Sequence, residues 1–414
     1  MAARGALALL GGAVLSMLWS ATAFATPIPK ATWQTNGTVR AIRISNGVIY
    51  LGGDFTGLRP PGAAEGTETV ARGHAAAIDA RTGRLLRWNP RVNGRVSAIA
   101  VFGKRVYLGG VFSKVGGRPR RNVAAVGRRK GHIKPWNPGA DNGVNVIRIG
   151  RSGGVYLGGE FGRVAGATRH RLARVSQTGA LTSWAPSVSQ VGGAACPPRC
   201  HAKILTMAFS PRGRGLYIGG HFGKVDGVAR NEAAKISLPH PHQVMAFNPN
   251  IYANANCPSC TTIETHRVYT IIPTSDRVFT CGGYWQVNGN RRSFNVSAFD
   301  PHSGRLLSTL TEQDDGDTPG CTLRAGILYV GGHFNVAGPD CQPNHTGTCS
   351  TRHHVAAFDT RDNKLLSWNP DANSPHGVFV VTHSHRRVAF GGFFTHFGGR
   401  PQQGIAVYTK GSLP

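Results

Sequence analysis

Short hydrophobic segments separated by turn residues dominate the pattern of this chain. They are about five to eight residues long and rich in Val, Ile, Tyr and Phe, which is typical of β-strands. One stretch shows four of them in succession, at 95–101, 105–112, 122–126 and 132–136. The turn Phe102-Gly103-Lys104 joins the first two, and such tight connections favour antiparallel hairpins.

One strand motif recurs seven times. It contains Gly-Gly followed closely by an aromatic residue, and its copies fall at 48–55, 106–112, 155–161, 216–222, 278–285, 328–334 and 388–394. Four antiparallel strands repeated roughly every 50–60 residues are the signature of a β-propeller blade. The fold class expected is therefore all-β, a seven-bladed β-propeller of four-stranded antiparallel blades. We expect the Gly-Gly pair to let neighbouring blades approach closely, which explains much of the total of 56 Gly.

The two ends of the chain are predicted to meet in one blade. The fourth segment ends in Trp-Asn-Pro at Trp88, Trp136 and Trp368, with Trp184-Ala-Pro as a variant. The last repeat stops at 404–408 without this signature, and the N-terminal segment 30–37 supplies a Trp before the first repeat. We therefore expect an N-terminal strand to complete the last blade and remove two open sheet edges.

The first twenty-five residues resemble a secretory signal peptide. Arg4 provides a small positive region, 6–19 is apolar, and Ala23-Phe24-Ala25 fits a small-x-small cleavage site. No later stretch is apolar enough for a transmembrane helix. We predict cleavage near Ala25, an extracellular location, and a single propeller domain over 26–414 that is a monomer.

The repeat motifs also resemble a known family. The Tyr-Leu-Gly-Gly-x-Phe strand, the following Ala-Ala-(Ile/Phe)-Asp, the Thr-Gly turn and Trp-Asn-Pro are similar to the delta-sixty repeat propellers of secreted bacterial proteins. The resemblance covers essentially all of the chain after residue 25. It implies a propeller, and it implies no particular chemistry because the family carries no agreed activity. The fifth repeat departs from the pattern, with Cys281 before its Gly-Gly.

The longest insertions are predicted to share one face of the propeller. Loops between strands two and three, and those leading to the next blade, lie on the same face, and these contain the insertions 56–73, 186–201, 248–265, 311–320 and 335–354. All eight Cys lie in or near them, and an even count in an exported chain favours disulfides. We predict the bridges Cys196–Cys200, Cys257–Cys260, Cys281–Cys321 and Cys341–Cys349, with the third joining blades five and six. A redox role for Cys257-Pro-Ser-Cys260 is disfavoured because no βαβ unit surrounds it.

The ligand-binding candidates occupy two repeated positions on the same face. The position after Gly-Gly carries Asp54, Glu160, His221 and His333, and the starts of inner strands carry His201, His266 and His376. The loops add Glu264 and Asp141. His and carboxylate groups converging on a propeller mouth could act as general acid and base, which makes Glu160, His221, His266 and His333 the catalytic candidates. The alternative is that the 17 His of a basic chain are scattered over its surface.

An acidic loop interrupts this basic sequence. It carries Glu312, Asp314, Asp315 and Asp317, and the three Asp are the candidates for a divalent metal site. Their spacing differs from that of an EF-hand, and they could instead bind Arg side chains. No cofactor is predicted apart from such a metal ion.

The charge balance favours an anionic partner without naming one. The formal net charge is +28, and basic clusters occur at 118–121, 128–130 and 169–171. Specific nucleic-acid recognition is not expected, because no known reading motif is present.

We therefore expect a secreted binding or scaffold protein, with an anionic or glycan cell-surface polymer bound at the loop-rich, disulfide-braced face. The alternative is an extracellular hydrolase or lyase that uses the His and carboxylate ring, with or without a metal ion. Three or more of the candidate side chains within metal-bonding reach of one another would favour the enzyme.

Overall fold

The fold is described by a computed structural model for residues 26–190, 201–238, 241–252, 267–284, 286–289, 295–311, 316–338, 341 and 349–414. In this part of the chain the regular elements are β-strands, apart from a single 3-10 turn at Lys410–Ser412. No helix among these residues has the length and apolar character needed to cross a bilayer.

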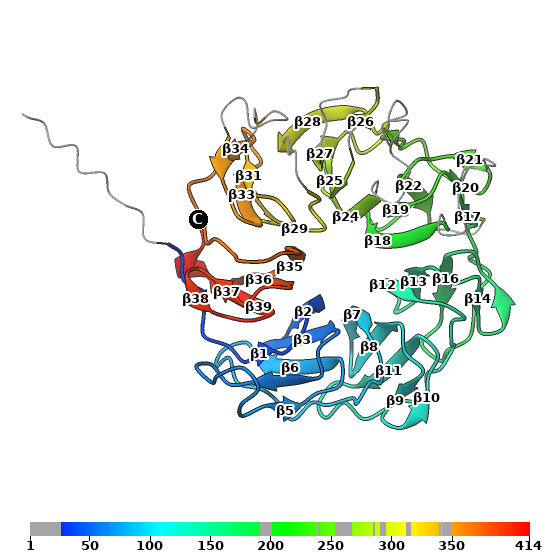
Figure 1. The fold of residues 1–414 in the computed structure, drawn as a ribbon. Coiled ribbons are helices and arrows are strands. Elements are labelled where there is room, and N and C mark those ends of the chain that lie inside the picture. The colour runs from blue at the N-terminus through cyan, green and yellow to red at the C-terminus, as the bar shows by residue number, and fades with distance from the viewer. Residues whose placement is uncertain are drawn as a thin grey trace, which may run out of the picture.

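The innermost strands form a closed ring (Figure 1). They are β2 (Val39–Ser45), β7 (Val96–Phe102), β12 (Val144–Ile149), β18 (Lys203–Phe209), β24 (Arg267–Pro273), β29 (Gly320–Arg324) and β35 (Val378–Ser384). Each contacts the next one along the chain, and β35 contacts β2, so the series returns to its start. A closed ring of antiparallel sheets is a β-propeller, and this prediction is confirmed.

Each inner strand begins one blade, and we number the blades in chain order. The second strands are β3 (Val48–Gly53), β8 (Arg105–Gly110), β13 (Val155–Gly159), β19 (Gly215–His221), β25 (Val278–Gly283), β30 (Ile327–Gly331) and β36 (Arg387–Gly392). The third strands are β6 (Ala75–Asp79), β11 (Val123–Gly127), β16 (Leu172–Val175), β22 (Ala233–Ser237), β27 (Val296–Phe299), β33 (Val355–Asp359) and β39 (Ile405–Thr409).

The fourth segment is shorter than the sequence indicated. It is a full strand in blade 5, β28 (Leu306–Thr311), and a two-residue strand in blade 6, β34 (Lys364–Leu365). In blades 1 to 4 it makes single bridges, such as Val126 with Ile133. An arginine replaces part of the missing pairing: Arg120 Nη2 donates to the carbonyl oxygen of Lys134 at 3.0 Å. The same contact recurs from Arg72, Arg169, Arg230 and Arg352.

The Gly-Gly pair has two separate packing roles. A Cβ at Gly109 would lie 2.8 Å from Cγ1 of Val144 in the next blade, so the first glycine permits close approach between blades as expected. A Cβ at Gly110 would lie 2.0 Å from the carbonyl oxygen of Arg95 in the same blade. The second glycine is therefore required by the inner strand of its own blade.

The Trp of the fourth segment connects adjacent blades. Trp136 packs edge-on against Tyr107 of its own blade, with ring centroids 5.0 Å apart, and its Nε1 donates to the carbonyl oxygen of Ser176 in the next blade at 2.9 Å. Trp88 and Trp368 make the same pair of contacts. Phe247 takes this place in blade 4, where it packs edge-on against Tyr217.

The N-terminal segment completes the last blade, as expected. Lys30 N donates to the carbonyl oxygen of Val407 at 2.8 Å, next to the free side of β39. The hydroxyl of Tyr408 donates to the carbonyl oxygen of Pro27 at 3.1 Å. The two ends of the chain thereby share one sheet.

Short hairpins recur on one face of the ring, called here the loop face. They lie between strands two and three and are β4–β5 (Gly57–Arg59 and Val70–Ala71), β9–β10 (Lys114–Val115 and Arg118–Pro119), β14–β15 (Arg163–Val164 and Ala167–Thr168), β20–β21 (Lys224–Val225 and Val228–Ala229), β31–β32 (Val336–Ala337 and Ser350–Thr351) and β37–β38 (His396–Phe397 and Arg400–Pro401). In blade 5, β26 (Gln286–Val287) occupies this place.

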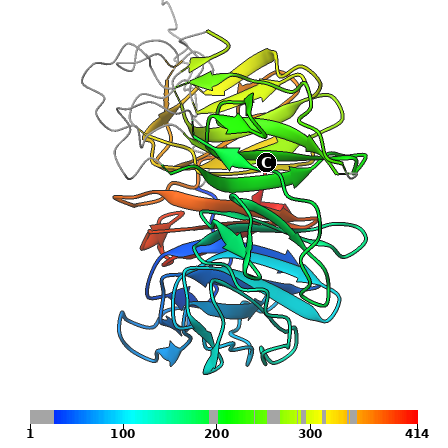
Figure 2. The ribbon, with the colours of Figure 1, turned by 90° about the vertical axis from the view of Figure 1, so that its right-hand side faces the viewer.

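These hairpins pair with the chain that leaves the preceding blade. Val92 bridges Val115 and Ala140 bridges Val164. The strands β1 (Gln34–Thr35), β17 (Val188–Ser189) and β23 (Ile251–Tyr252) pair in the same way with β4, β20 and β26. Both types of loop therefore lie on one face, as expected. Figure 2 shows the ring from the side, with the strands running between its two faces.

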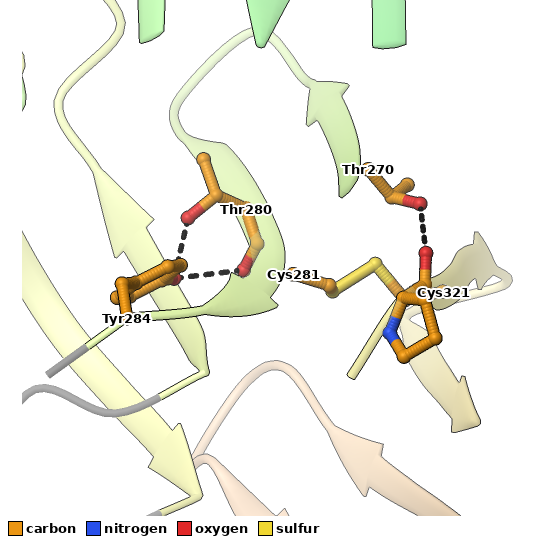
Figure 3. Close-up of a disulfide and its surroundings, with 6 residues drawn as sticks. Thr270, Thr280, Cys281, Tyr284 and Cys321 are labelled. Carbon is orange, nitrogen blue, oxygen red and sulfur yellow. Dashed lines mark hydrogen bonds between the residues drawn. A yellow bond between two sulfur atoms is a disulfide. The ribbon is translucent and has the colours of Figure 1, made fainter. Parts of the chain in front are cut away.

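Two of the four predicted disulfides are confirmed. Cys281 is bonded to Cys321, and this bridge joins β25 of blade 5 to β29 of blade 6 (Figure 3). Cys341 is bonded to Cys349. Beside the first bridge, Thr270 Oγ1 donates to the carbonyl oxygen of Pro319 at 2.8 Å. The predicted bridges Cys196–Cys200 and Cys257–Cys260 lie outside the described residues.

Candidate functional site

A cavity of about 590 Å³ follows the axis of the propeller. Residues from all seven inner strands or from the positions next to them line it. Six of the lining side chains are cationic: Arg40, Arg43, Arg95, Arg148, Lys203 and Arg267. Glu160 is the one acidic residue among the described residues of this lining. We call this cavity the cationic channel.

The cations occupy two levels of the channel. Arg95, Lys203 and Arg267 stand at or just before the first residue of their inner strands, and Arg40 occupies the β-bulge between Val39 and Ala41. These positions lie toward the loop face, where the inner strands begin. Arg43 and Arg148 lie further along β2 and β12, about 10 Å deeper at 3.3 Å per residue.

The deeper pair consists of two like charges that act on each other. Arg43 and Arg148 are exposed to the water of the channel, yet the surrounding walls disfavour their charged forms. Burial, and secondarily the charge of Arg43, lower the pKa of Arg148 to about 10. The charge of Arg43 acts on Arg148, so the two side chains repel each other, and an anion between them would relieve this repulsion.

Two of the predicted acids are already engaged by their neighbours at the mouth of the channel. Asp54 forms an ion pair with Arg40, and each side chain is about one-third exposed. Glu160 Oε1 accepts a hydrogen bond from Asn145 Nδ2 at 3.3 Å. The Arg40 guanidinium also lies over the Phe379 ring, 5.3 Å from its centroid. The mouth is therefore built from side chains that hold one another in position.

A second pocket of about 430 Å³ opens beside the channel on the loop face. Thr38, Arg40, Asp317, His333, His376, Phe379 and Phe393 line it. Three predicted residues, Asp317, His333 and His376, thus come together here, on blades that are adjacent in the ring. Arg40 and Phe379 line both cavities, so the pocket adjoins the channel at these two side chains.

His221 points away from the mouth and into its own blade. It is buried, and its Nδ1 lies 3.2 Å from Oε1 of Glu232, also buried. Its Nε2 lies 2.9 Å from Nε2 of Gln190. Burial raises the pKa of Glu232 to about 7, opposed by the hydrogen bond and charge of His221. His221 therefore belongs to a buried polar cluster and does not complete a ring at the mouth.

The remaining predicted residues do not converge either. His201 lines a separate hollow of about 340 Å³ together with His170 and Gln190. Asp141 Oδ1 accepts hydrogen bonds from the backbone N–H groups of Gly162 and Arg163, the same turn-capping role that Asn93 has in blade 2. Within the described ranges, no three His, Cys, Asp or Glu residues are grouped so as to hold a metal ion. The candidates His266, Glu264, Glu312, Asp314 and Asp315 lie outside those ranges.

The sequence reasoning missed the cations of the channel and the aromatic residues of the pocket. It considered the position after Gly-Gly and the histidines that precede inner strands, and it treated the basic residues as clusters along the chain. The missed signal was positional: Arg95, Lys203 and Arg267 all fall just before or at the start of an inner strand. Phe393 occupies the same position after Gly-Gly as Asp54 and Glu160.

The basic clusters seen in the sequence are partly structural. Arg120 and Arg169 bind carbonyl groups of fourth segments, and Arg171 Nε donates to the carbonyl oxygen of Ala202 at 2.7 Å. Arg128 reaches the carbonyl oxygen of Gly103 on the face opposite the loops. The net charge is therefore a weaker functional indication than the charge inside the channel.

Comparison with known proteins gives a fold and no family. No family model matches the chain, and no curated protein matches it in sequence. The computationally designed protein Ika8 is similar in structure, with a TM-score of 0.51 and 12% identity over 93% of this chain and 100% of that chain. The extracellular domain of BT4673 from B. thetaiotaomicron has a TM-score of 0.50 and 12% identity, covering 92% of this chain and 40% of that chain. The WD40 β-propeller domain of Doa1 matches with a TM-score of 0.49 at 9% identity, over 92% of this chain and 96% of that chain.

These likenesses concern architecture alone. At such identities they carry no ligand or activity to this chain. The resemblance to the delta-sixty repeat family stays a prediction.

Proposed function

We propose that this is a secreted binding or scaffold protein whose ligand is an anionic polymer of the cell surface or its surroundings. The ligand enters the cationic channel from the loop face. One observation carries the proposal: among the described residues, six cations and a single acid line one cavity. The disulfide Cys281–Cys321 supports export, since such bonds persist in oxidising compartments, and so does the signal-like segment before residue 26.

The channel favours a polymer over a single small ion. Cations occur at two levels about 10 Å apart along the strands, while a phosphate or carboxylate group can meet only one level at a time. Glu160, the one described acid of the lining, is hydrogen-bonded to Asn145, and the deeper cations Arg43 and Arg148 form no ion pair among the described residues. A chain with repeated negative charges would satisfy both levels together.

Removing two charges at the mouth tests the proposal. We expect linear polyphosphate and uronate oligosaccharides to bind the wild-type protein at low salt. The double variant Arg95→Gln, Lys203→Gln should weaken both interactions about tenfold or more, because each cation makes a charge-assisted contact. Titration calorimetry measures this directly.

The matched control removes two charges from the opposite face. Arg129 and Lys130 are exposed in the turn between strands three and four of blade 2, and Arg129→Gln, Lys130→Gln changes the net charge equally. This variant should bind like the wild type. Equal losses for the two double variants, or no binding of any anionic polymer, would refute the proposal.

A hydrolase or lyase is the second candidate function, favoured by the meeting of Asp317, His333 and His376 in one pocket. Turnover would produce new reducing ends or a conjugated double bond in the uronate oligosaccharides during the same experiments. Loss of this signal in His376→Ala would support an enzyme, and unchanged oligosaccharides would remove this candidate.

A further inference from the structure

The pocket beside the channel differs from it chemically. Its lining combines the aromatic residues Phe379 and Phe393 with the hydrogen-bonding groups of Thr38, Asp317 and His376. Phe393 is 43% exposed, and it occupies the position after Gly-Gly at which four other blades carry Asp54, Glu160, His221 and His333. An exposed aromatic ring among hydrogen-bonding groups fits a ligand with one apolar face and a polar rim.

The aromatic wall is held in place by its own loop. Ser374 Oγ donates to the carbonyl oxygen of Phe393. Ser374 Oγ in turn accepts hydrogen bonds from the backbone N–H groups of His376 and Gly377, at 3.0 and 2.7 Å. The His376 ring lies 5.2 Å from the Phe393 ring, at an interplanar angle of 56°. Ser374 thus connects the backbone segments that carry His376 and Phe393, and this link reduces the ordering needed when a ligand binds.

We propose that this pocket is a saccharide subsite and that the ligand of the channel is an acidic polysaccharide. One sugar ring packs its C–H face against Phe393, and its hydroxyl groups bond to Asp317 and His376. A neighbouring sugar of the same chain places its carboxylate in the channel near Arg95. The inference rests on the proposed function and names the class of its ligand.

Continuity of the two cavities supports a single ligand spanning both. Arg40 and Phe379 line the pocket and the channel alike, and Arg40 is fixed between Asp54 and the Phe379 ring. A polyphosphate would satisfy the cations and leave the aromatic wall uncovered. A neutral glycan would cover the wall and leave the cations without partners. An acidic polysaccharide has groups for both.

The test compares one aromatic substitution across two classes of probe. The probes are linear polyphosphate and a set of uronate oligosaccharides, namely galacturonate, alginate and hyaluronan fragments, titrated at one low ionic strength. Phe393→Ala should weaken binding of at least one uronate about three- to tenfold, the range expected for one aromatic contact, and leave polyphosphate binding unchanged. Phe102→Ala is the matched control, because Phe102 is 39% exposed at the turn end of β7 on the opposite face.

The outcomes separate this inference from the function on which it rests. If Phe393→Ala leaves uronate binding unchanged, or weakens polyphosphate equally, the saccharide subsite is wrong. Failure of every uronate to bind has the same consequence, even where polyphosphate binds. If Arg95→Gln, Lys203→Gln leaves both classes of probe bound as in the wild type, the proposed function itself fails. His376→Ala, at a second exposed position of the pocket, should reproduce the selective loss.

Discussion

At the residue scale, the buried pair of His221 and Glu232 is the clearest case of a polar group held against its preference for water. Glu232 is 7% exposed, and its Oε2 has no hydrogen-bond partner among the described residues. Burial raises the pKa of this carboxyl to about 7, and the hydrogen bond from His221 and the charge of Arg267 act in the opposite direction. The fold therefore tolerates the protonated form better than the ionised one.

This arrangement predicts a pH dependence of stability. Because the pKa of Glu232 is about 7 in the folded protein and about 4.5 when unfolded, its contribution to stability is present below pH 4.5 and is lost as pH rises toward 7. The loss is at most about 1.4 kcal/mol per pH unit. Glu232→Gln should remove this dependence, measured as free energies of urea unfolding at pH 5 and pH 8. A wild type and a variant with the same pH dependence would contradict the assignment.

The residues that form the site show the limit of sequence reasoning at this scale. Asp54, Glu160 and His221 share one repeated position, so the pattern alone suggested a ring. Their roles differ because their partners come from other segments: Arg40 for Asp54, Asn145 for Glu160 and Glu232 for His221. Such partners follow from packing, and no repeat period encodes them.

At the scale of elements, repeated contacts outside the main strands hold each blade together. Arg120 bonds to the fourth segment of its own blade, and Trp136 connects that segment to the next blade. In the sequence, the Trp-Asn-Pro motif marked the end of the fourth segment, whereas the bond of the Trp to the next blade is a finding of the structure. The structural role of arginines such as Arg120 could not be predicted, because a structural and a functional guanidinium contribute equally to the net charge and look alike in a sequence.

A covalent link joins blades 5 and 6. The inner strand β29 has 5 residues, whereas β24 has 7, and the disulfide Cys281–Cys321 lies between these blades with a sequence separation of 40. Removing it as Cys281→Ala, Cys321→Ala should lower the free energy of unfolding by about 4 kcal/mol in the loop-entropy model. Denaturant unfolding under non-reducing conditions measures the change.

The second bridge provides the comparison. Cys341 and Cys349 are only 8 residues apart, so Cys341→Ala, Cys349→Ala should cost less, about 2.5 kcal/mol. If removing the short bridge lowers the free energy of unfolding as much as removing Cys281–Cys321, or more, the prediction that the bridge between the blades contributes more to stability is wrong.

At the scale of the whole molecule, closure determines where the site can form. The ring joins β35 to β2 through contacts between strands far apart in sequence, and the N-terminal segment bonds to Val407 near the other end of the chain. The pocket lies near this junction, since it takes Thr38 from the first blade and Phe393 from the last. Closure thus builds the site as well as removing open sheet edges.

The sequence predicted this architecture well because the same strand motif occurs seven times in it. Strand order, blade closure, the loop face and two disulfides all followed from motifs and spacing. The channel did not, because its cations come from five different blades at positions that become neighbours only when the ring closes. Each of these blades supplies only one or two of the cations, and a single blade therefore does not reveal the cavity.

The dependence of polyphosphate affinity on salt is the most direct test of the central claim, that the channel binds an anionic polymer. The logarithm of the binding constant should fall with the logarithm of salt concentration, and Arg95→Gln, Lys203→Gln should reduce that slope by about 1.5 because two charged contacts are lost. Arg129→Gln, Lys130→Gln on the opposite face should leave the wild-type slope unchanged. Equal slopes for the wild type and the channel variant, or a reduced slope for the variant of the opposite face, would contradict the account.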